Sequence, residues 1–530
     1  MRELRLGGLQ ARLPCPIASA VEAELVDWDR VDGTRRLLAG DASLWSGCDE
    51  AEWLGWLEPG AGCDTEAFRQ WRHTAAGAGW SRVVLLGMGG SSLGARLLCE
   101  GAHSVPGPRG AGARTLVVLD TTDAEEIASA RGELDLETTL FVVASKSGTT
   151  VETVSLEAYF VAEMESSGLD VGPRVLAITD PGTELATRAV ERGYHLLYGR
   201  ADIGGRFSAL SPFGLGVLIA MGVEPDSVVA AARLARSELA EGAAAGNDPG
   251  LALGAVLGAL AKLGHDLVEI VPPAAVPSLA DWLEQLLAES TGKEGGGILP
   301  IRCGDGTAHA GLVAALWNGR QVADRVGEVR SDWKGPHSEA LGREIFRWQV
   351  ATAVAGSILG VNPFDQADVD SAKVAAHERL SRRRDLSPRV VPTTDALARL
   401  VAGSSASRHV GVLAYLPRTA EIVAGVEKVR KAMTDATGRP VTASFGPRYL
   451  HSAGQLFKGG TPGAFLFITR RGAPCVLVPG SGVTFDQLQA AQASGDLAVL
   501  AERGRPVEAI ELSGELTAGL DDIASRLRQL

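Results

Sequence analysis

The sequence predicts an α/β protein built from parallel sheets. From about residue 80 onward, short runs of β-branched and apolar residues alternate with helix-like segments. Alternation at this spacing is typical of strand–helix–strand units, which form parallel sheets. Glycine- and hydroxyl-rich turns also stand between a predicted strand and a predicted helix at 87–94 and 145–153. Together these observations predict two doubly wound parallel-sheet domains, followed by a C-terminal α/β unit.

The N-terminal part, residues 1–75, is expected to form a helical lead-in to the first sheet. Its short amphipathic segments contain tryptophans at a density that more often covers a core than binds a ligand. These tryptophans are Trp28, Trp45, Trp53, Trp56 and Trp71. We therefore expect their rings to cover a core.

Two sheet domains are predicted next, over residues 76–240 and 241–378. In the first, strands are expected at 83–86, 115–120, 140–144 and 174–179, with helices at 93–100 and 151–166. In the second, we expect a helix at 251–263, a strand at 267–271, a helix ending near Glu289, a strand at 298–302 and a helix at 346–359.

The C-terminal unit is predicted over residues 379–530, beyond an arginine-rich surface connection that ends in prolines. Its strands are expected at 409–416, 441–445, 464–469 and 476–479, and its helices at 419–437 and 514–527. The alternation again indicates an α/β arrangement.

Composition limits the partners and the compartment. The net charge of −13 argues against nucleic acid as the main partner. The six cysteines are scattered, without a CxxC pair or a His/Cys cluster, which indicates free thiols in a reducing compartment and no metal site. The longest uncharged runs, 207–223 and 348–364, are broken by glycine and proline, and the N-terminus lacks the apolar region of a secretory signal. A cytoplasmic protein that contacts no membrane is expected.

Two loops have the composition of an anion-binding site. Residues 87–94 read GMGGSSLG, in which glycines let the backbone approach an anion at a helix N-terminus. Residues 145–153 read SKSGTTVET, whose hydroxyls suit a phosphate monoester without a metal. The first loop could instead be a tight connection, and the second a Ser/Thr-rich helix cap. Neither has the spacing of a dinucleotide-binding or Walker A motif.

Three charged side chains further along suit acid–base chemistry. Arg206 follows two glycines and precedes an apolar helix, where it either lies at the surface or stabilises an oxyanion in a cleft. Glu289 ends an apolar segment just before the glycine-rich turn 295–297. A carboxylate against apolar walls suits proton abstraction, although an acid at a helix end is more often solvated. Lys373 follows the Asn-Pro-Phe-Asp-Gln run that starts at Asn362, and only its context distinguishes it from a solvated lysine.

In this order the motifs resemble those of the glucose-6-phosphate isomerase family, whose fold contains two sugar-isomerase (SIS) domains. The resemblance covers roughly residues 80–375, and the run from Asn362 to Lys373 is a close match. The C-terminal unit is most similar to the isomerase half of bifunctional transaldolase/glucose-6-phosphate isomerase proteins. We expect the transaldolase half of those proteins to be absent here.

The resemblance implies a substrate-binding role for several residues. The substrate phosphate would be bound by Ser145, Ser147, Thr149 and Thr150. Gly90 and Ser91 would line the adjacent sugar site, and Gln366 would lie near the phosphate end. The family needs no cofactor and no metal, and its subunits share a site, so a homodimer is expected.

The resemblance also implies catalytic roles. Glu289 would move a proton between C2 and C1 through a cis-enediol, Arg206 would stabilise the enediolate, and Lys373 would assist ring opening. The family uses a histidine for ring opening as well. His309 lies 20 residues beyond Glu289 (309 − 289), without the family's flanking residues. His451 lies in the run LHSAGQ, which resembles the bifunctional proteins. The flanking residues favour His451, and both histidines stay candidates.

The expected function is therefore metal-independent interconversion of D-glucose 6-phosphate and D-fructose 6-phosphate, in glycolysis and gluconeogenesis. One alternative is a dual phosphoglucose/phosphomannose isomerase, which uses the same proton chemistry. Another is a non-catalytic SIS protein that binds a sugar phosphate as a regulator. Such a regulator needs the hydroxyl loop but not Glu289, Arg206 and Lys373, so their joint presence favours an enzyme.

Overall fold

The computed structural model describes residues 1–103, 114–242, 244–302, 313–317, 327–331, 338–365 and 393–530. The chain divides into two compact units. Unit 1 comprises Met1–Leu119, Asp135–Val154 and Met164–Asp365, and unit 2 comprises Asp120–Leu134, Ser155–Glu163 and Gln366–Leu530. The two sheets that the sequence assigns to separate domains thus lie in one unit, and part of the predicted first domain groups with the C-terminal unit.

The first sheet of unit 1 has five strands, all parallel, in the order β4-β3-β5-β6-β7. The strands are β3 (Arg82–Gly87), β4 (Thr115–Leu119), β5 (Thr139–Ala144), β6 (Val175–Thr179) and β7 (His195–Tyr198). β5 and β6 are buried along their whole length, as apolar strands of a parallel sheet covered on both faces are. The first four strands confirm the predicted ones, whereas β7 was not expected.

The order of this sheet creates a switch point. The chain passes from β3 to β4 and then crosses to β5 on the other side of β3, so the strand order reverses between β3 and β5. In open α/β sheets, ligands bind beyond the carboxyl ends of the strands at such a point. The loops that follow β3 and β5 are the two predicted anion-binding loops.

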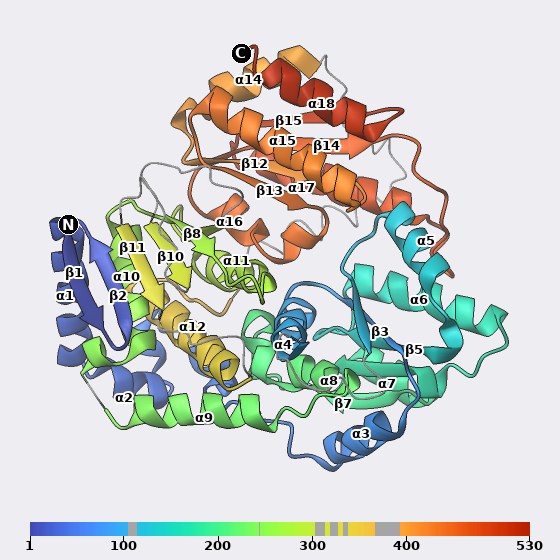
Figure 1. The fold of residues 1–530 in the computed structure, drawn as a ribbon, viewed down its shortest axis with the longest axis horizontal. Helices are drawn as coiled ribbons and strands as arrows, with labels where there is room; N and C mark the ends of the chain where they lie inside the picture. Colours follow the sequence, from blue (N-terminus) through green and yellow to red (C-terminus); the bar gives the residue numbers. More distant parts are fainter. Residues whose placement is uncertain (104–113, 243, 303–312, 318–326, 332–337, 366–392) are drawn as a thin grey trace. The chain divides into compact units, whose positions relative to one another are not determined.

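The second sheet of unit 1 has six strands in the order β1-β2-β11-β10-β8-β9. They are β1 (Arg2–Leu6), β2 (Leu9–Leu13), β8 (Leu267–Val271), β9 (Leu299–Arg302), β10 (Val313–Trp317) and β11 (Gly327–Ser331). β8 to β11 are parallel, and β2 adds antiparallel to β11 with Arg12 opposite Glu328. In Figure 1 the blue β1–β2 hairpin lies beside β11.

This hairpin corrects the expectation of a wholly helical lead-in. In β1 and β2 the leucines and Ala11 are buried alternately with exposed polar residues, which is the period-2 pattern of a strand. Gly7 and Gly8 adopt φ values of 56° and 89°, the left-handed backbone that a two-residue hairpin turn requires. The lead-in is helical only from Cys15 onward.

Helices surround both sheets of unit 1. They are α1 (Cys15–Arg30), α2 (Gly33–Leu38), α3 (Glu66–Gly77), α4 (Leu93–His103), α6 (Val151–Ser166, whose middle groups with unit 2), α7 (Glu184–Arg192), α8 (Pro212–Ala220), α9 (Asp226–Ala240), α10 (Pro249–Lys262), α11 (Ser278–Thr291) and α12 (Ser338–Leu359). α10 packs closely on α12, because a Cβ at Gly254 would lie 2.6 Å from the Cβ of Val354. Trp28, Trp45, Trp56 and Trp71 are buried in this core and Trp53 is partly buried, which confirms their covering role.

Unit 2 contains a parallel sheet of four strands in the order β13-β12-β14-β15. The strands are β12 (His409–Ala414), β13 (Val441–Phe445), β14 (Gly463–Arg470) and β15 (Val507–Leu512). The helices are α5 (Ala124–Glu133), α14 (Thr393–Gly403), α15 (Ala420–Thr437), α16 (Gly454–Gly459), α17 (Phe485–Glu502) and α18 (Leu516–Leu527). α14, α15 and α18 share one core with the sheet.

The predicted strand at 476–479 is wrong. Prolines at 474 and 479 remove ladder donors on both sides, and the segment makes only an isolated bridge between Leu477 and Thr484. The fourth strand is β15, which the sequence analysis did not identify. No helix in the described part of the chain is both long and apolar enough to cross a membrane.

Candidate functional site

The loop after β3 approaches the segment that carries Arg206. The loop forms the short helix η4 (Gly89–Ser91), and Arg206 lies in η7 (Gly205–Leu210). A Cβ on Gly90 would lie 2.0 Å from the carbonyl oxygen of Gly205, so only glycine permits this contact. The hydroxyl of Ser208 also donates to the carbonyl oxygen of Gly90 at 3.3 Å. The predicted residue Gly90 therefore joins the two loops, with Ser91 beside it.

The loop after β5 gathers its hydroxyls where α6 begins. Ser145 is buried and its Oγ donates to Oγ1 of Thr150 at 3.0 Å. The N–H and Oγ1 of Thr149 donate to Oγ of Ser147 at 3.3 and 3.1 Å. Gly148, at φ +69°, allows the turn between them. The four predicted phosphate-binding side chains thus come from one turn at a helix N-terminus, where the dipole and free N–H groups favour an anion.

Lys146, in the same turn, is already occupied. Its ammonium contacts the carboxylate of Asp180 and donates to the carbonyl oxygen of Arg200 at 3.1 Å. It therefore anchors the turn to the neighbouring strand ends. The attraction of the turn for an anion rests on its hydroxyls, its N–H groups and the helix dipole.

Glu289 and Arg206 form a buried ion pair. Glu289 lies in the last turn of α11 and is 5% exposed, and Arg206 is 2% exposed. Nη1 of Arg206 lies 3.4 Å from Oε1 of Glu289. The other carboxylate oxygen accepts a hydrogen bond from Nε2 of Gln285, one helical turn earlier, at 2.9 Å. The carboxylate is thus held in one orientation beside a cation, on a helix whose neighbouring buried side chains are mostly apolar.

The rest of the Arg206 guanidinium is fixed by backbone and hydroxyl acceptors. Nε donates to Oγ of Ser290 at 2.8 Å, and Nη2 donates to the carbonyl oxygens of Pro363 and Asp365 at 2.6 and 2.8 Å. Burial lowers the pKa of Arg206, and the carboxylates of Glu289 and Asp365 oppose that shift. A guanidinium stays protonated under such conditions. The site therefore keeps a fixed positive charge beside the carboxylate.

Lys293 is a further residue of this site, and the sequence alone assigns it no role. It is 8% exposed, contacts the carboxylate of Asp365 and the carbonyl oxygen of Asn362, and donates to the carbonyl oxygen of Asp365 at 3.0 Å. Burial and the charge of Arg206 lower the pKa of Lys293 to about 8, against the opposing pull of Asp365 and Glu289. The only indication in the sequence that Lys293 belongs to the site is its position four residues after Glu289.

The turn 362–365 rests on aromatic rings from the N-terminal segment. The ring of Phe364 lies 5.2 Å from Trp45, 6.5 Å from Trp56 and 5.3 Å from Phe207. Trp45 itself donates to the carbonyl oxygen of Ala353 at 2.8 Å. Trp45 and Trp56, from the segment between β2 and β3, thus pack against this turn, which is a structural role.

The described residues bring together part of the predicted site. η4 and η7 contact each other and both contact α11, so Gly90, Arg206 and Glu289 belong to one cluster at the carboxyl side of β3. His451 ends the short helix η10 (Arg448–His451) in unit 2. Gln366, Lys373 and His309 lie outside the described residues. Among the described residues, no group of three or more His, Cys, Asp and Glu side chains is arranged to hold a metal ion.

The fold and site define an α/β protein with a hydroxyl-rich loop at a sheet switch point and a buried carboxylate–guanidinium pair. Comparison with known proteins finds a family similar to part of the chain. The Phosphoglucose isomerase family matches residues 65–296, which include both loops, Arg206 and Glu289. Residues 65–296 of this chain are therefore similar to the Phosphoglucose isomerase family.

Individual proteins with this name are also similar to the chain. The chain is 33% identical over 221 residues to a probable glucose-6-phosphate isomerase of Haloarcula marismortui, a match that covers 42% of this chain and 49% of that protein. It is 29% identical over 392 residues to a glucose-6-phosphate isomerase of Heliobacterium modesticaldum, covering 61% of this chain and 86% of that protein. The chain thus spans about half the length of the first of these relatives.

Solved structures share the fold. A hypothetical protein from Thermus thermophilus is 25% identical, with a TM-score of 0.58, and the match covers 70% of this chain and 100% of that one. A glucose-6-phosphate isomerase from Chlamydia trachomatis is 17% identical, with a TM-score of 0.57, and the match covers 76% of this chain and 92% of that one. The second likeness concerns the fold alone.

Proposed function

We propose that this protein is an aldose–ketose isomerase that interconverts D-glucose 6-phosphate and D-fructose 6-phosphate. The proposal rests on one observation above all, the buried Glu289 carboxylate held 3.4 Å from the Arg206 guanidinium. Proton transfer between C2 and C1 needs a carboxylate base and a cation for the oxyanion, and needs no metal. The resemblance to named glucose-6-phosphate isomerases supports this choice of substrate.

In the proposed reaction, the phosphate is bound by Ser145, Ser147, Thr149 and Thr150, while Gly90 and Ser91 line the sugar. Glu289 takes the proton from C2 of the open-chain aldose and returns it to C1 through a cis-enediol. When the carboxylate becomes neutral, the charge of Arg206 is no longer balanced by it and can stabilise the enediolate oxygen. The ion pair thus supplies its charge at the moment when charge develops on the substrate.

Ring opening is assigned by resemblance alone. We propose that Lys373 and a histidine open the ring, with Gln366 near the phosphate end, and that His451 is the histidine in preference to His309. Replacing each histidine separately with Asn should identify it. The correct variant should lose turnover of the cyclic substrate, and the other should keep it.

The test of the proposed function is turnover of fructose 6-phosphate, with the product coupled to a glucose-6-phosphate dehydrogenase. Replacing Glu289 with Gln should reduce kcat by at least about 1,000-fold, since the base is lost, while fructose 6-phosphate still binds. Glu294→Gln is the matched control, because Glu294 is an exposed acid just beyond the end of α11. Substantial activity in Glu289→Gln would reject the base assignment.

The same assay separates the alternatives. Mannose 6-phosphate turnover beside fructose 6-phosphate would favour the dual phosphoglucose/phosphomannose isomerase. Binding of fructose 6-phosphate without any turnover would favour the non-catalytic regulator. A cytoplasmic homodimer that serves glycolysis and gluconeogenesis completes the proposal, and light scattering of the purified protein tests its oligomeric state.

A further inference from the structure

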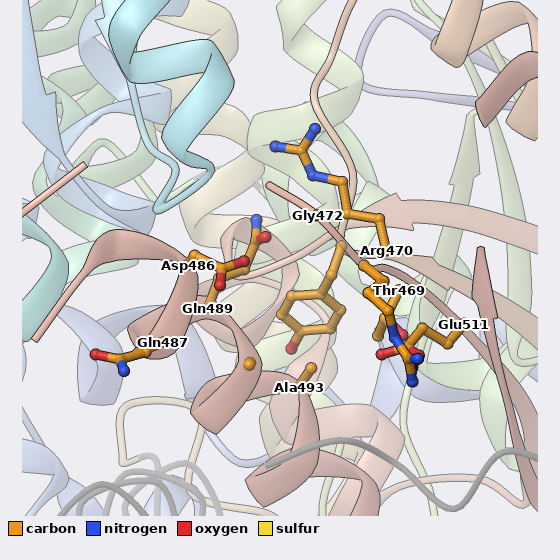
Figure 2. A pocket seen from close by; sticks show the side chains of 11 residues that line it. Thr469, Arg470, Gly472, Asp486, Gln487, Gln489, Ala493 and Glu511 are labelled. Atoms are coloured by element: carbon orange, nitrogen blue, oxygen red, sulfur yellow. Dashed lines mark ion pairs between the residues drawn. The ribbon is translucent and has the colours of Figure 1, made fainter. Parts of the chain in front are cut away.

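Unit 2 contains a cavity of about 220 Å³ that the isomerase proposal does not use. It lies beyond the carboxyl ends of β12, β14 and β15, where Tyr415, Thr469, Arg470 and Glu511 line it. Figure 2 shows Asp486, Gln487 and Gln489, from α17, on one side of the cavity, and Thr469 and Glu511 on the other.

The cavity coincides with the switch point of this sheet. The chain passes from β12 to β13 and then crosses to β14 on the other side of β12, so the strand order reverses between β12 and β14. Tyr415 follows β12 and Thr469 lies near the end of β14, and both line the cavity. Unit 2 thus has a hollow where open α/β sheets bind ligands.

Two polar groups at this cavity are buried without a hydrogen-bond partner. Thr469 is 8% exposed, and its Oγ1 has no partner. Nε of Arg470 is buried and also has none, although its Nη2 donates to both carboxylate oxygens of Asp123 at 2.9 Å. A buried polar group without a partner costs free energy, so a ligand that supplies one is favoured.

The carboxylate of Asp486, a hydrogen-bond acceptor, lines the same cavity as Thr469 and Arg470. Asp486 is half-buried in the first turn of α17, and burial raises its pKa against the opposing charge of Arg470. Glu511 is occupied, because Arg471 contacts it at 2.6 Å. Asp486 is therefore the carboxylate that can accept a hydrogen bond from a ligand in the cavity.

The charges of the lining exclude strongly charged ligands. Two arginines, Arg470 and Arg471, are matched by two carboxylates, Asp486 and Glu511. Arg470 is also bound to the carboxylates of Asp123 and Glu125, so little of its charge is left to attract a phosphate. A cation would meet two guanidinium groups. An uncharged molecule that both donates and accepts hydrogen bonds fits all of these groups.

We propose that this cavity binds a small uncharged polyhydroxyl compound, an unphosphorylated sugar or polyol. Its hydroxyls accept from Thr469 and Arg470 and donate to the carboxylate of Asp486. A volume of about 220 Å³ is below the roughly 300–1,000 Å³ of pockets for drug-sized ligands, which suits a single six-carbon unit. The site is distinct in chemistry from the hydroxyl loop of unit 1, which suits an anion.

Calorimetric titration of the full-length protein with sorbitol, glucose and fructose tests this proposal. At least one of the three should bind saturably, and Thr469→Val and Asp486→Asn should each weaken that binding by about tenfold, the loss expected for one hydrogen bond in a dry site. Thr442→Val is the matched control, because Thr442 is a similarly buried hydroxyl without a partner on β13 and does not line the cavity. It should bind like the unchanged protein.

Three results would overturn the proposal. The first is the absence of saturable binding of all three compounds. The second is binding by the Thr469→Val and Asp486→Asn proteins that is as strong as binding by the unchanged protein. The third is displacement of the bound compound by inorganic phosphate. Asp486→Asn keeps the test decisive if Thr469→Val does not fold, since Asp486 is only half-buried. Neither variant touches the groups proposed for isomerisation, so isomerase turnover reports independently on the other site.

Discussion

The guanidinium of Arg206 and the ammonium of Lys293 both donate to the carbonyl oxygen of Asp365, at 2.8 and 3.0 Å. Two cations that share an acceptor repel each other, and the carboxylates of Glu289 and Asp365 offset this repulsion. Lys293 holds the same turn, 362–365, that accepts hydrogen bonds from Arg206, so we infer that it helps to fix the position of the guanidinium. Lys293 is therefore a positioning residue for the proposed reaction.

This arrangement predicts an alkaline limb in the pH profile. The pKa of Lys293 is lowered to about 8, so its positive charge disappears as the pH rises through about 8. The enediolate then loses part of its electrostatic stabilisation, and kcat/KM for fructose 6-phosphate should fall. Lys293→Met should lower kcat/KM by about 10- to 100-fold and abolish the limb, since a charged hydrogen bond is worth about 1.5–3 kcal/mol.

Two further variants sharpen this measurement. Lys293→Arg keeps a charge that does not titrate below about pH 12, so its limb should move to higher pH. Lys262→Met removes a lysine that pairs with Glu24 on the surface of unit 1 and should leave the profile unchanged. If the pH profile of kcat/KM for Lys293→Met keeps an alkaline limb with the midpoint of the unchanged protein, another group causes that limb.

A second prediction at this scale concerns Gly90. Alanine there places a Cβ 2.0 Å from the carbonyl oxygen of Gly205, and the backbone must move to relieve the clash. Overpacking of this kind costs about 1–3 kcal/mol and displaces η7, which carries Arg206. Gly90→Ala should therefore lower both the melting temperature and kcat, measured by calorimetry and the coupled assay.

The control for Gly90 is Gly77→Ala at the end of α3, where no heavy atom lies within 4 Å of the added Cβ. It should change neither quantity. Normal turnover in Gly90→Ala would mean that the loops tolerate separation and that their contact is incidental to the site.

The residues of the site differ in how far the sequence could predict them. Arg206 and Glu289 stood out because each follows or precedes a glycine turn at the edge of an apolar helix. Lys293 did not, because its partners Asn362 and Asp365 lie 69 and 72 residues downstream and only the folded chain brings them to it. A spacing pattern reports local geometry, whereas this cluster is made by tertiary contacts.

At the scale of elements, the turn between β5 and α6 is the proposed phosphate site, and it can be tested by its effect on binding. Phosphate does not change during isomerisation, so its contacts stabilise the ground state and the transition state alike. Thr150→Val removes the hydroxyl that accepts from Ser145 and should raise KM for fructose 6-phosphate by about tenfold with a smaller change in kcat.

The matched control for this variant is Thr153→Val. Thr153 lies in the first turn of α6, is 1% exposed, and its hydroxyl has no partner. The KM of this variant should stay within about twofold of that of the unchanged protein, because the hydroxyl that it loses makes no hydrogen bond. A drop in kcat alone in Thr150→Val would argue against a phosphate role.

The elements were predictable where one local pattern dominates. β3, β5 and β6 are continuous apolar runs ended by glycine, serine or threonine, and the structure confirms them. The first thirteen residues carry a clear period-2 pattern, but each strand is only five residues long, and the helices that follow suggested a helical segment. The sequence does not reveal β15 because Glu508 and Glu511 leave only Ala509 and Ile510 as a continuous apolar stretch, and the strand depends on β14 for its pairing.

At the scale of the whole molecule, the stability of unit 2 should be sensitive to acid through His409. Its ring is buried at the start of β12 between Phe457 and Phe465, and neither ring nitrogen has a hydrogen-bond partner. Burial, with the charges of Arg505 and Arg408, lowers the pKa of His409 to about 3 from its usual value of 6.5. Between these two values the unfolded chain binds a proton that the folded chain excludes, so stability falls as the pH falls.

The expected size of this effect can be measured by denaturant unfolding. Below about pH 6.5 the free energy of unfolding should fall by about 1.4 kcal/mol per pH unit through this residue. At about pH 5 it should therefore be lower by about 2 kcal/mol. His409→Phe keeps an aromatic ring among aromatic neighbours and should remove this part of the pH dependence. His73→Gln, at an exposed position, should leave it unchanged. If the free energy of unfolding falls equally with pH in His409→Phe and in the unchanged protein, the acid sensitivity belongs to another group.

The antiparallel pairing of β2 with β11 has a consequence for biosynthesis. Arg12 lies opposite Glu328, so 316 residues (328 − 12) separate the two partners along the chain. A ribosome that adds about 5–20 residues per second needs roughly 15–60 s between them. During that interval the buried leucines of the hairpin have no sheet to join and are exposed to chaperones and to other nascent chains. The second sheet is therefore the part of this protein whose yield in a cell should depend most on what meets the chain during its synthesis.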